Sequence, residues 1–467
     1  VPRKECGGEP GIPGGHAPCD DLAPTGRATE GITMDGSFPV DGNQVSDVVG
    51  VGFGPSNLAL AVAVAEHNEA VGPEERLRAR FLERQPDFGW HRGMLLPDTT
   101  LQVSFLKDLV SLRNPRSSFS FISYLHDRNR LVDFVNHQCF FPSRREYHDY
   151  LEWVAGRFVD SVHYDHDVVD VLPVHEGPDV VAFDVVAVQG GAGATRRLRT
   201  RNVVLAPGLE PVLPQGITPS DRVWHSSELL HRLDGFRDRL PDRPRFVVVG
   251  AGQSAAEVMA HLHGVFPKAT VRSVCSRYGF APADDSPFVN QLFDPAAVDE
   301  FFEAALPARE NILRVHAGTN YSAVDGDLIS ELYRRSYQER VSGEPRLHFE
   351  RLARVVATEE RDEEVSVSVL SLTDGRVTDR GCDVVVLATG YRPRDALRPL
   401  GQLAALCKLD ANGWPRVERN YRITTTETVR AGIYLQGGTE HSHGLSSTLL
   451  SNLAVRSGEI TRALAAP

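Results

Sequence analysis

The chain has 467 residues, enough for two or three domains with cores of their own. Its net charge of −12 argues against a nucleic-acid or anionic-membrane partner, which would need a basic face, and no apolar run approaches the roughly 18 residues of a membrane-spanning helix. No secretory signal is visible, and the six cysteines form no Cys-x-x-Cys pair, so we expect a reduced, cytoplasmic protein.

Residues 1–44 are rich in Gly, Pro, Asp and Thr and have little periodicity. Such a composition predicts a disordered N-terminal extension. Met34 is an alternative start, so part of this extension need not belong to the native protein.

The first strong pattern is residues 47–60, where a short run rich in valine turns through several glycines into an alanine-rich helix. Strand, glycine turn and helix begin a dinucleotide-binding fold, in which the helix N-terminus faces a pyrophosphate. The pattern is Gly52-x-Gly54-x-x-Asn57, so its third glycine is replaced. Glu83 ends the next strand-like stretch, where it can hydrogen-bond a ribose.

Two unusual stretches follow. Trp90, His91 and Met94 lie in a predicted loop, where they either pack that loop or contact a flavin ring. Lys107 falls in the mostly apolar stretch 101–112. A lysine there usually extends to solvent, and the rarer alternative is that it meets a carboxylate inside a pocket.

Residues 143–159 read as an amphipathic helix that begins with a Ser143/Glu146 capping box. Strand-like alternation runs from 168 to 188, followed by a polar turn at 190–195. Residues 202–208 read as a buried strand that ends at a glycine and closes a nucleotide-binding sheet.

A second glycine turn, Gly250-x-Gly252-x-x-Ala255, lies between a strand and a helix within residues 246–262. The strand after it ends at Arg277, where NAD-binding folds carry an acidic residue. An arginine there favours the 2′-phosphate of NADP, and the alternative is a solvent-exposed arginine.

The last third of the chain is harder to interpret. Residues 280–345 lack a nucleotide-fold pattern and read as an inserted, substrate-recognising segment, whereas 383–391 read as another buried strand with a glycine turn. His441 and His443 lie in a glycine-rich loop at 437–450. Since no cysteine or third histidine is near, a pocket-lining loop is a better interpretation than a metal site.

Two nucleotide folds in one chain suggest a flavin and a nicotinamide with hydride transfer between them. The chain has neither a closely spaced redox cysteine pair nor haem or iron–sulfur spacing. Dioxygen remains as the electron acceptor and points to a monooxygenase, with a diffusible quinone or a carrier protein as the competitor.

The motifs together resemble the microbial N-hydroxylating flavin monooxygenases, and among them the L-ornithine N-hydroxylases. The matching stretches run from near Asp47 to the last helix, and they are 50–57, 90–95, 105–111, 225–228, 250–257, 284–290, 383–391 and 443–446. The choice of ornithine over lysine depends on 101–105 and 111–115, which look more like the ornithine branch. Residues 1–44 have no counterpart in the family.

The resemblance implies an α/β fold with two Rossmann-like dinucleotide-binding domains, for FAD and NADPH, and a smaller, mainly helical substrate segment. The expected divisions are 1–44 for the extension, 45–240 for the first part of the FAD domain, 241–381 for the NADPH domain with its insertion at about 281–345, and 382–467 for the return to the FAD domain and the C-terminal substrate loop and helix.

It also implies roles for single residues. Around FAD we expect Gly52, Gly54 and Asn57 at the pyrophosphate, Glu83 at the ribose, and Trp90, His91 and Gln102 near the isoalloxazine. Gly252, Ser254 and Arg277 are expected to hold NADPH. The further cofactor-binding residues are Pro55, Ser56, Arg144, Gly250, Gln253, Thr389, Gly390 and Leu445.

For the amino-acid substrate, Lys107 and Asn290 are expected at the carboxylate and α-amino end, Asn320 near the reacting amine, and Ser447 in the last loop. Lys107 and Asn320 are the predicted catalytic residues, and no metal is predicted.

The implied activity is hydroxylation of the L-ornithine side-chain amine with NADPH and dioxygen through a flavin hydroperoxide. The product would be Nδ-hydroxyornithine, a precursor for a siderophore or another peptide natural product. Alternatives are an L-lysine or diamine N-hydroxylase, an FAD/NADPH electron-transfer reductase, and a nucleotide sensor without turnover. The family suggests a homotetramer.

Overall fold

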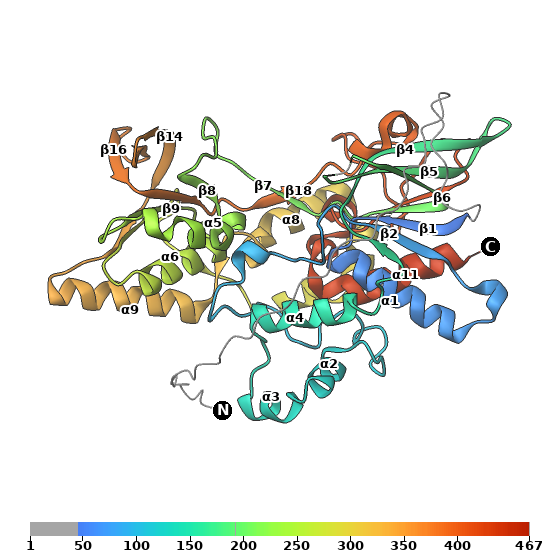
Figure 1. The fold of residues 1–467 in the computed structure, drawn as a ribbon, viewed down its shortest axis with the longest axis horizontal. Helices are drawn as coiled ribbons and strands as arrows, with labels where there is room; N and C mark the ends of the chain where they lie inside the picture. The colour runs from blue at the N-terminus through green and yellow to red at the C-terminus, as the bar shows by residue number, and fades with distance from the viewer. Residues whose placement is uncertain (1–44, 192, 467) are drawn as a thin grey trace, which may run out of the picture. The chain divides into compact units, whose positions relative to one another are not determined.

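The computed structural model describes residues 45–191 and 193–466, so the predicted extension 1–44 lies outside the described residues. Within them the chain builds two sheets of mainly parallel strands flanked by helices, which confirms the predicted α/β class (Figure 1). No described helix is both long enough and apolar enough to cross a bilayer.

The first sheet is centred on the strand that precedes the first glycine turn. That strand, β1, is buried along its whole length, as its run of valines predicts, and parallel neighbours lie on both of its sides. The strand order is β3-β2-β1-β6-β5-β4, with β19 also paired to β6. The strands are β1 (Ser46–Val51), β2 (Ala79–Leu82), β3 (Val162–His163), β4 (His166–Glu176), β5 (Asp179–Gln189), β6 (Thr195–Leu205) and β19 (Gly432–Leu435).

Helices cover this sheet. Helix α1 (Pro55–Ala70) packs along the final helix α11 (Leu453–Ala465) and touches α4 (Arg144–Ala155). The short helices α2 (Phe121–Asp127) and α3 (Leu131–His137) lie beside α4 (Figure 1). Half of the predicted capping box is present: the Ser143 hydroxyl accepts a 3.1 Å hydrogen bond from the Glu146 N–H, whereas the Glu146 carboxylate lies 3.4 Å from the Arg130 guanidinium.

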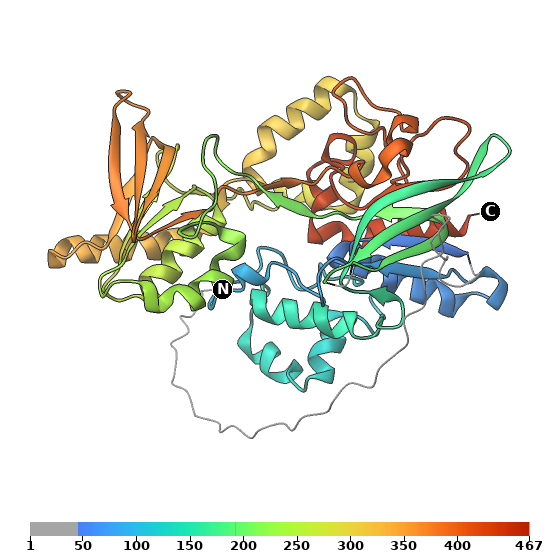
Figure 2. The same cartoon turned by 45° about the horizontal axis from the view of Figure 1, so that its top comes forward.

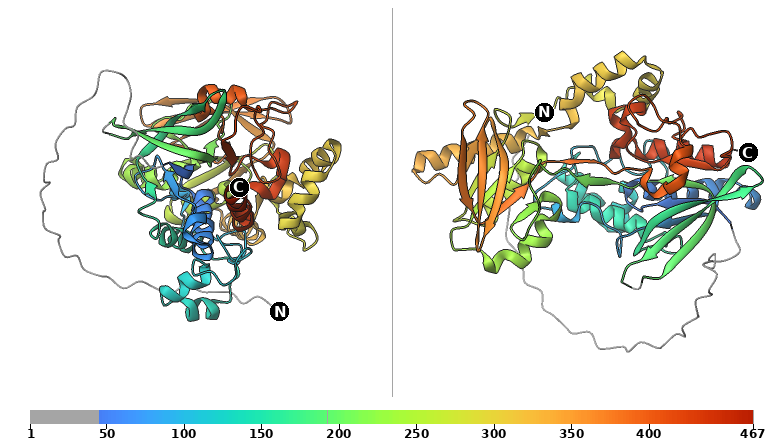
Figure 3. Two further views of the ribbon diagram at one scale, coloured as in Figure 1. Left: turned by 90° about the vertical axis from the view of Figure 1, so that its right-hand side faces the viewer. Right: turned by 90° about the horizontal axis from the view of Figure 1, so that it is seen from above.

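The strand-like stretch 168–188 is a hairpin and not one strand. It comprises the antiparallel strands β4 and β5, which extend from the sheet (Figure 3). The reversal falls at Gly177, whose φ is +60°. The alternation of apolar residues continues on both sides of the turn, so periodicity alone does not reveal it.

The second sheet is entirely parallel, in the order β13-β10-β9-β17-β8. Three helices pack on or beside it: α5 (Leu229–Phe236), α6 (Gln253–Val265) and α9 (Gly326–Ser342). An antiparallel three-stranded sheet packs against it (Figure 2). The strands are β8 (Val223–His225), β9 (Arg245–Val249), β10 (Thr270–Val274), β13 (Leu347–Glu350) and β17 (Val384–Leu387), with β14 (Ala353–Arg361), β15 (Glu364–Ser371) and β16 (Val377–Cys382) in the antiparallel sheet.

Two of the predicted domain boundaries lie elsewhere in the structure. The expected return to the first sheet at 382 comes later, because β17 pairs with β9 and β8 and only β19 rejoins β6. Strand β8 likewise belongs to the second sheet although it precedes residue 240. The crossing segments pair as β7 (Leu209–Pro211) and β18 (Tyr391–Pro393). Each sheet contains a strand that ends at a leucine followed by Ala-x-Gly. The sequence alone therefore did not show which strand belongs to which sheet.

The segment expected at about 281–345 is mainly helical. It contains β11 (Ala281–Pro282), the 3-10 turn η5 (Val289–Phe293), α7 (Pro295–Glu303), α8 (Leu306–Asn320), β12 (Ala323–Val324) and α9. The C-terminal loop is built from α10 (Glu440–His443) and the 3-10 turns η7 (Leu445–Thr448) and η8 (Leu450–Asn452). Turn η7 contacts η5, α8 and α11, so it joins the helical segment to the last helix.

Candidate active site

The two glycine turns open into one large cavity of about 1830 Å³. Helix α1 begins at Gly54 and helix α6 at Gly252, and neither helix has a side-chain cap at its N-terminus. The first N–H groups of a helix need partners, and its dipole favours an anion there. A cavity of this size exceeds the ~1,000 Å³ upper range of pockets for a single small ligand. The arrangement therefore fits two phosphate-bearing dinucleotides.

Most of the predicted cofactor residues line this cavity. They are Gly52, Gly54, Pro55, Ser56, Glu83, Trp90, His91, Gly250, Gly252, Gln253, Ser254, Arg277, Thr389 and Gly390. The residues Asn57, Gln102, Arg144 and Leu445 do not line it. Gln102 is exposed, and Leu445 is buried in η7.

The first glycine turn has a tight side and an open side. Gly52 has φ +83°, and a Cβ placed on it would lie 2.5 Å from the Ala206 carbonyl oxygen. A Cβ on Gly54 would have nothing within 4 Å. Gly52 is therefore required by the protein, whereas Gly54 leaves a free approach for a phosphate.

Asn57 stands where the usual fingerprint has a third glycine, and it holds the turn from beneath. Its fully buried side chain donates to the Gly52 carbonyl at 2.7 Å and to the Val51 carbonyl at 3.3 Å. These bonds fix the backbone that the cofactor would meet. The residue shapes the site without reaching the cavity.

Glu83 lies at the end of β2, beside the same turn. One carboxylate oxygen accepts from the Phe53 N–H at 2.6 Å and the other from the Gln85 N–H at 2.9 Å. A carboxylate oxygen accepts more than one hydrogen bond, so Glu83 keeps capacity for a ribose hydroxyl from the cavity.

Trp90 and His91 form part of an aromatic wall. The His91 ring packs edge-on against Trp90 and Tyr391, with centroids 5.0 and 5.7 Å away. His91 faces the cavity in a left-handed backbone conformation, φ +50°. Desolvation by the surrounding protein, and secondarily the charge of Arg144, lower its pKa to about 4. The imidazole is therefore neutral near pH 7.

Arg144 links the two halves of the site. Its guanidinium makes a bidentate pair with Glu257, with N–O distances of 2.7 and 2.9 Å, so α4 is joined to α6. Gln253 donates to the same carboxylate at 2.9 Å and accepts from the Asp325 N–H at 2.8 Å. Arg144 thus orders the second glycine turn from behind.

Arg277 follows β10, the strand next to β9, and lines the cavity. Its guanidinium donates to the Ser322 carbonyl at 3.3 Å and is otherwise exposed. Ser322 is held at φ +59° and approaches Gly252 closely. The cation is thus near the second glycine turn, where a 2′-phosphate of NADP would lie.

The predicted substrate residues come from four segments, and the three whose side chains the structure describes, Lys107, Asn290 and Ser447, do not line the large cavity. The Lys107 ammonium lies 5.9 Å from the Phe293 ring, which belongs to the same turn, η5, as Asn290. Asn290 is exposed and donates to the Asp285 carbonyl at 2.9 Å. The Ser447 hydroxyl is buried without a hydrogen-bond partner among the described residues. Asn320 ends α8, and its side chain lies outside the described residues.

His441 and His443 both have protein partners. His441 stacks on Trp414 and contacts the Pro415 carbonyl at 2.9 Å. His443 is fully buried and stacks on Tyr421 with centroids 4.2 Å apart. Desolvation lowers its pKa to about 3. Both rings anchor the C-terminal loop.

Gln436 and Arg456 are two further residues of the site that were not predicted from the sequence. Gln436 lines the cavity and donates to the Ser56 carbonyl at 3.0 Å. Arg456 is fully buried in α11, where its spacing from Leu453, Ile460 and Leu464 places it on the apolar face. A charged residue inside an apolar stripe was a signal available in the sequence.

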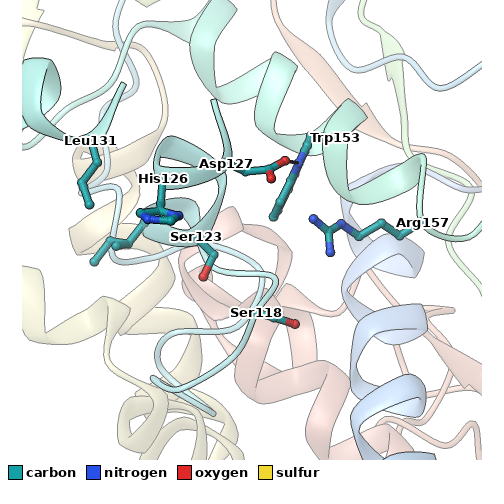
Figure 4. Close-up of a pocket in the computed structure, with 8 residues that line it drawn as sticks. Ser118, Ser123, His126, Asp127, Leu131, Trp153 and Arg157 are labelled. Carbon is teal, nitrogen blue, oxygen red and sulfur yellow. Dashed lines mark hydrogen bonds between the residues drawn. The ribbon is translucent and has the colours of Figure 1, made fainter. Parts of the chain in front are cut away.

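A second, smaller hollow of about 370 Å³ lies among α2, α3 and α4 (Figure 4). Its Trp153 indole donates to Asp127 at 2.6 Å, and the Arg157 guanidinium lies 4.0 Å from the Trp153 ring. None of the predicted site residues whose side chains are described lines it.

Comparison with known proteins gives concordant matches. The model of the L-lysine 6-monooxygenase/L-ornithine 5-monooxygenase family matches residues 44–393. An L-ornithine N(5)-monooxygenase of Burkholderia cepacia is 42% identical over 406 residues, covering 86% of this chain and 90% of that protein.

Among solved structures, the ornithine N-hydroxylase of Kutzneria sp. 744, in a complex with reduced FAD, NADP⁺ and L-ornithine, is 48% identical, with a TM-score of 0.85. The match covers 90% of this chain and 99% of that one. The L-lysine 6-monooxygenase of Pseudomonas syringae is 33% identical, with a TM-score of 0.78, and the match again covers 90% and 99%.

Proposed function

The chain belongs to the L-lysine 6-monooxygenase/L-ornithine 5-monooxygenase family, and from this membership we propose that it hydroxylates the side-chain amine of L-ornithine with NADPH and dioxygen, using FAD. The observation that carries the proposal is the single cavity into which two uncapped helix N-termini open, each preceded by a glycine turn. FAD, when bound, would accept hydride from NADPH and activate dioxygen.

Ornithine is favoured over lysine by the comparisons. The ornithine enzymes described above are 42% and 48% identical to the chain, and the lysine enzyme is 33% identical. One methylene in a pocket changes binding by only about 1–3 kcal/mol. A lysine or diamine hydroxylase is therefore the nearest alternative, and it would differ in pocket length only.

We assign the residues as follows. The first glycine turn, with Ser56 and Glu83, holds FAD, and the second, with Ser254 and Arg277, holds NADPH. The loop bearing Lys107, with η5 and η7, binds the amino acid. Support for that last assignment is that Lys107 lies over the ring of η5 and that η5 contacts η7.

The amine must be neutral to accept oxygen, because only then does it carry a lone pair. A lysine-like amine has a pKa of about 10.4, so deprotonation at pH ~7.5 costs about 4 kcal/mol. A partly desolvated pocket disfavours the ammonium and reduces that cost. Amides and hydroxyls that orient the amine then suffice, as Asn320 and the unpartnered hydroxyl of Ser447 would. A strong side-chain base is not required.

The test is the amount of hydroxylated amine formed per NADPH oxidised, with ornithine, lysine and putrescine compared. We expect close to one product per NADPH with ornithine and mainly peroxide with the other two. Equal coupling with lysine would contradict the ornithine assignment. Peroxide alone with all three would contradict the assigned substrate pocket. A reductase would form no hydroxylated amine but would reduce a carrier, and a sensor would hold FAD that NADPH does not reduce.

Replacing Arg277 with alanine is expected to raise the KM for NADPH about tenfold and to change that for NADH less than twofold. The reason is that a guanidinium–phosphate bond of roughly 1.5–3 kcal/mol is available only to NADPH. Initial-rate measurements with both nucleotides check this. An equal loss with both would mean that Arg277 acts through Ser322 and not through the phosphate.

We further propose a homotetramer in the cytoplasm that supplies Nδ-hydroxyornithine for a siderophore or another peptide natural product. The free thiols of Cys139, Cys275, Cys382 and Cys407 are consistent with a reducing compartment. The exposed apolar side chains of Val132 and Val135 on α3 are consistent with a protein contact. Sedimentation of the purified chain measures the oligomeric state, and a monomer would contradict it.

A further inference from the structure

Arg456 is a buried cation with only neutral partners. Its side chain has no exposed surface, although it is one of the largest fully buried side chains in the described structure. No described carboxylate forms an ion pair with it, since the nearby Glu459 is engaged with Arg419 at 2.8 and 3.0 Å. Burying a charge without a counter-charge is expensive.

Two of the three neutral partners of Arg456 line the proposed flavin site. The Arg456 guanidinium donates to the Gln436 side-chain oxygen at 2.9 Å, to the Ser56 hydroxyl oxygen at 3.0 Å, and to the Ser447 carbonyl. Ser56 and Gln436 both line the cavity. The cation therefore lies one side chain behind the wall of the cavity.

Ser56 is placed between the Arg456 guanidinium and the cavity, so it can accept a hydrogen bond from the cation and donate one to a ligand. It belongs to the first turn of α1, which follows the glycine turn. Its oxygen accepts from Arg456, and its hydroxyl makes no hydrogen bond to an acceptor among the described residues. The proton of that hydroxyl is therefore free for a ligand in the cavity. A hydroxyl that accepts from a cation is a stronger donor than an isolated one.

The N-terminus of α1 is a second source of positive potential beside Arg456. The positive end of the α1 dipole and the guanidinium are close to each other. Because both are positive, each makes the electrostatic energy of the other less favourable. An anion in front of Ser56 would compensate both. The pyrophosphate is the anionic part of FAD, and it belongs in front of this helix by the geometry of the glycine turn.

We propose that Arg456 is the resident counter-charge of the FAD pyrophosphate, acting through Ser56 as a positioning residue. The inference rests on the proposed FAD site. Because Arg456 also holds the Ser447 carbonyl, the same cation ties the flavin-binding turn to the C-terminal loop.

The test is the dissociation constant of FAD for the full-length chain after its flavin has been removed, followed by flavin fluorescence. Arg456→Gln, which keeps hydrogen-bonding capacity but not charge, is expected to raise the dissociation constant at least tenfold. Arg456→Lys, which keeps the charge, is expected to raise it less than threefold. Ser56→Ala leaves Arg456 in place and is expected to raise it at least threefold, so the proposal can be tested even if Arg456→Gln fails to fold.

Arg419→Met is the matched control. Arg419 contacts the same helix but already has carboxylate partners in Glu459 and Asp299. We expect lower thermal stability and an FAD dissociation constant within twofold of the wild type. Equal losses in Arg456→Gln and Arg456→Lys, or no loss in Ser56→Ala, would overturn the proposal. A wild-type chain that binds no FAD would instead refute the proposed function.

Discussion

Replacing Lys107 with alanine is expected to raise the KM for ornithine about 10- to 100-fold while NADPH still reduces the flavin at the wild-type rate. A charge-assisted bond to the ornithine carboxylate is worth roughly 1.5–3 kcal/mol, which corresponds to that range. The Lys107 side chain does not line the nucleotide cavity, so flavin reduction has no reason to change.

The surroundings of Lys107 support a ligand-binding role over a structural one. Its ammonium forms no hydrogen bond or ion pair with a side chain in residues 45–191 or 193–466, and it lies over the face of the Phe293 ring. The next residue, Asp108, is different. Its buried carboxylate accepts hydrogen bonds from the N–H groups of Val110, Ser111 and Phe121. Asp108 therefore holds the loop, and Lys107 is left to bind a ligand.

Two further variants separate charge from packing. Lys107→Met keeps the apolar stem, and Lys107→Arg keeps the charge. If the Lys107 charge binds the ornithine carboxylate, Lys107→Met should behave like Lys107→Ala, and Lys107→Arg should retain most of the affinity for ornithine. Stopped-flow reduction by NADPH and steady-state ornithine kinetics measure the two functions separately. Parallel loss of both in Lys107→Ala would show that Lys107 is structural.

The features that could be predicted from sequence are those that neighbouring residues encode. The strand, glycine turn and helix around Gly52 and Gly250 are complete within residues 46–70 and 245–265, and the Ser143 N-cap of α4 bonds the N–H of Glu146, three residues on. Their geometry follows from φ/ψ preferences and capping, which act locally. The structure therefore has them where the sequence predicts them.

Contacts between distant residues could not be predicted in the same way. Arg144 was expected near a cofactor, but its partner Glu257 is 113 residues away, and the pair joins α4 to α6. Arg456 and Ser56 are 400 residues apart. A single sequence contains no signal for such pairs: the apolar face of α11 marks Arg456 as unusual, but it does not identify the residue that Arg456 contacts.

Sheet membership was ambiguous for a related reason. Residues 384–387 and 203–205 have the same buried-strand pattern, and each strand is followed three residues later by a glycine, Gly390 or Gly208. Their sheets differ because β17 pairs with β9 whereas β6 pairs with β1. Parallel pairing depends on crossover connections that the strand itself does not encode.

Replacing Gly54 with alanine is expected to raise the FAD dissociation constant at least tenfold and to change the stability of the flavin-free chain little. The new methyl group meets no protein atom within 4 Å, and the residue has an ordinary φ of −79°. The loss of a glycine at the helix N-cap costs about 1 kcal/mol or less. A pyrophosphate at the N-terminus of α1 would, however, collide with the methyl, and such overpacking costs about 1–3 kcal/mol.

Gly52→Ala is the matched variant two residues earlier, and it should fail for the opposite reason. Its methyl would lie 2.5 Å from the Ala206 carbonyl at a φ of +83°, where an L side chain is strained. We expect a lower unfolding temperature in the flavin-free chain, before any cofactor is added. Thermal unfolding with and without FAD, together with FAD titration, measures both effects for both variants.

Comparing the two variants shows whether each glycine is required by the bound ligand or by the packing of the protein itself. If Gly54→Ala loses FAD while its flavin-free form unfolds near the wild-type temperature, Gly54 is a glycine because of the ligand, and the pyrophosphate approaches it. If Gly54→Ala binds FAD as tightly as the wild type, the phosphate lies elsewhere along α1, and the assignment of Gly54 is wrong. Gly52→Ala would then still be destabilised, because its strain arises within the protein whether or not FAD is bound.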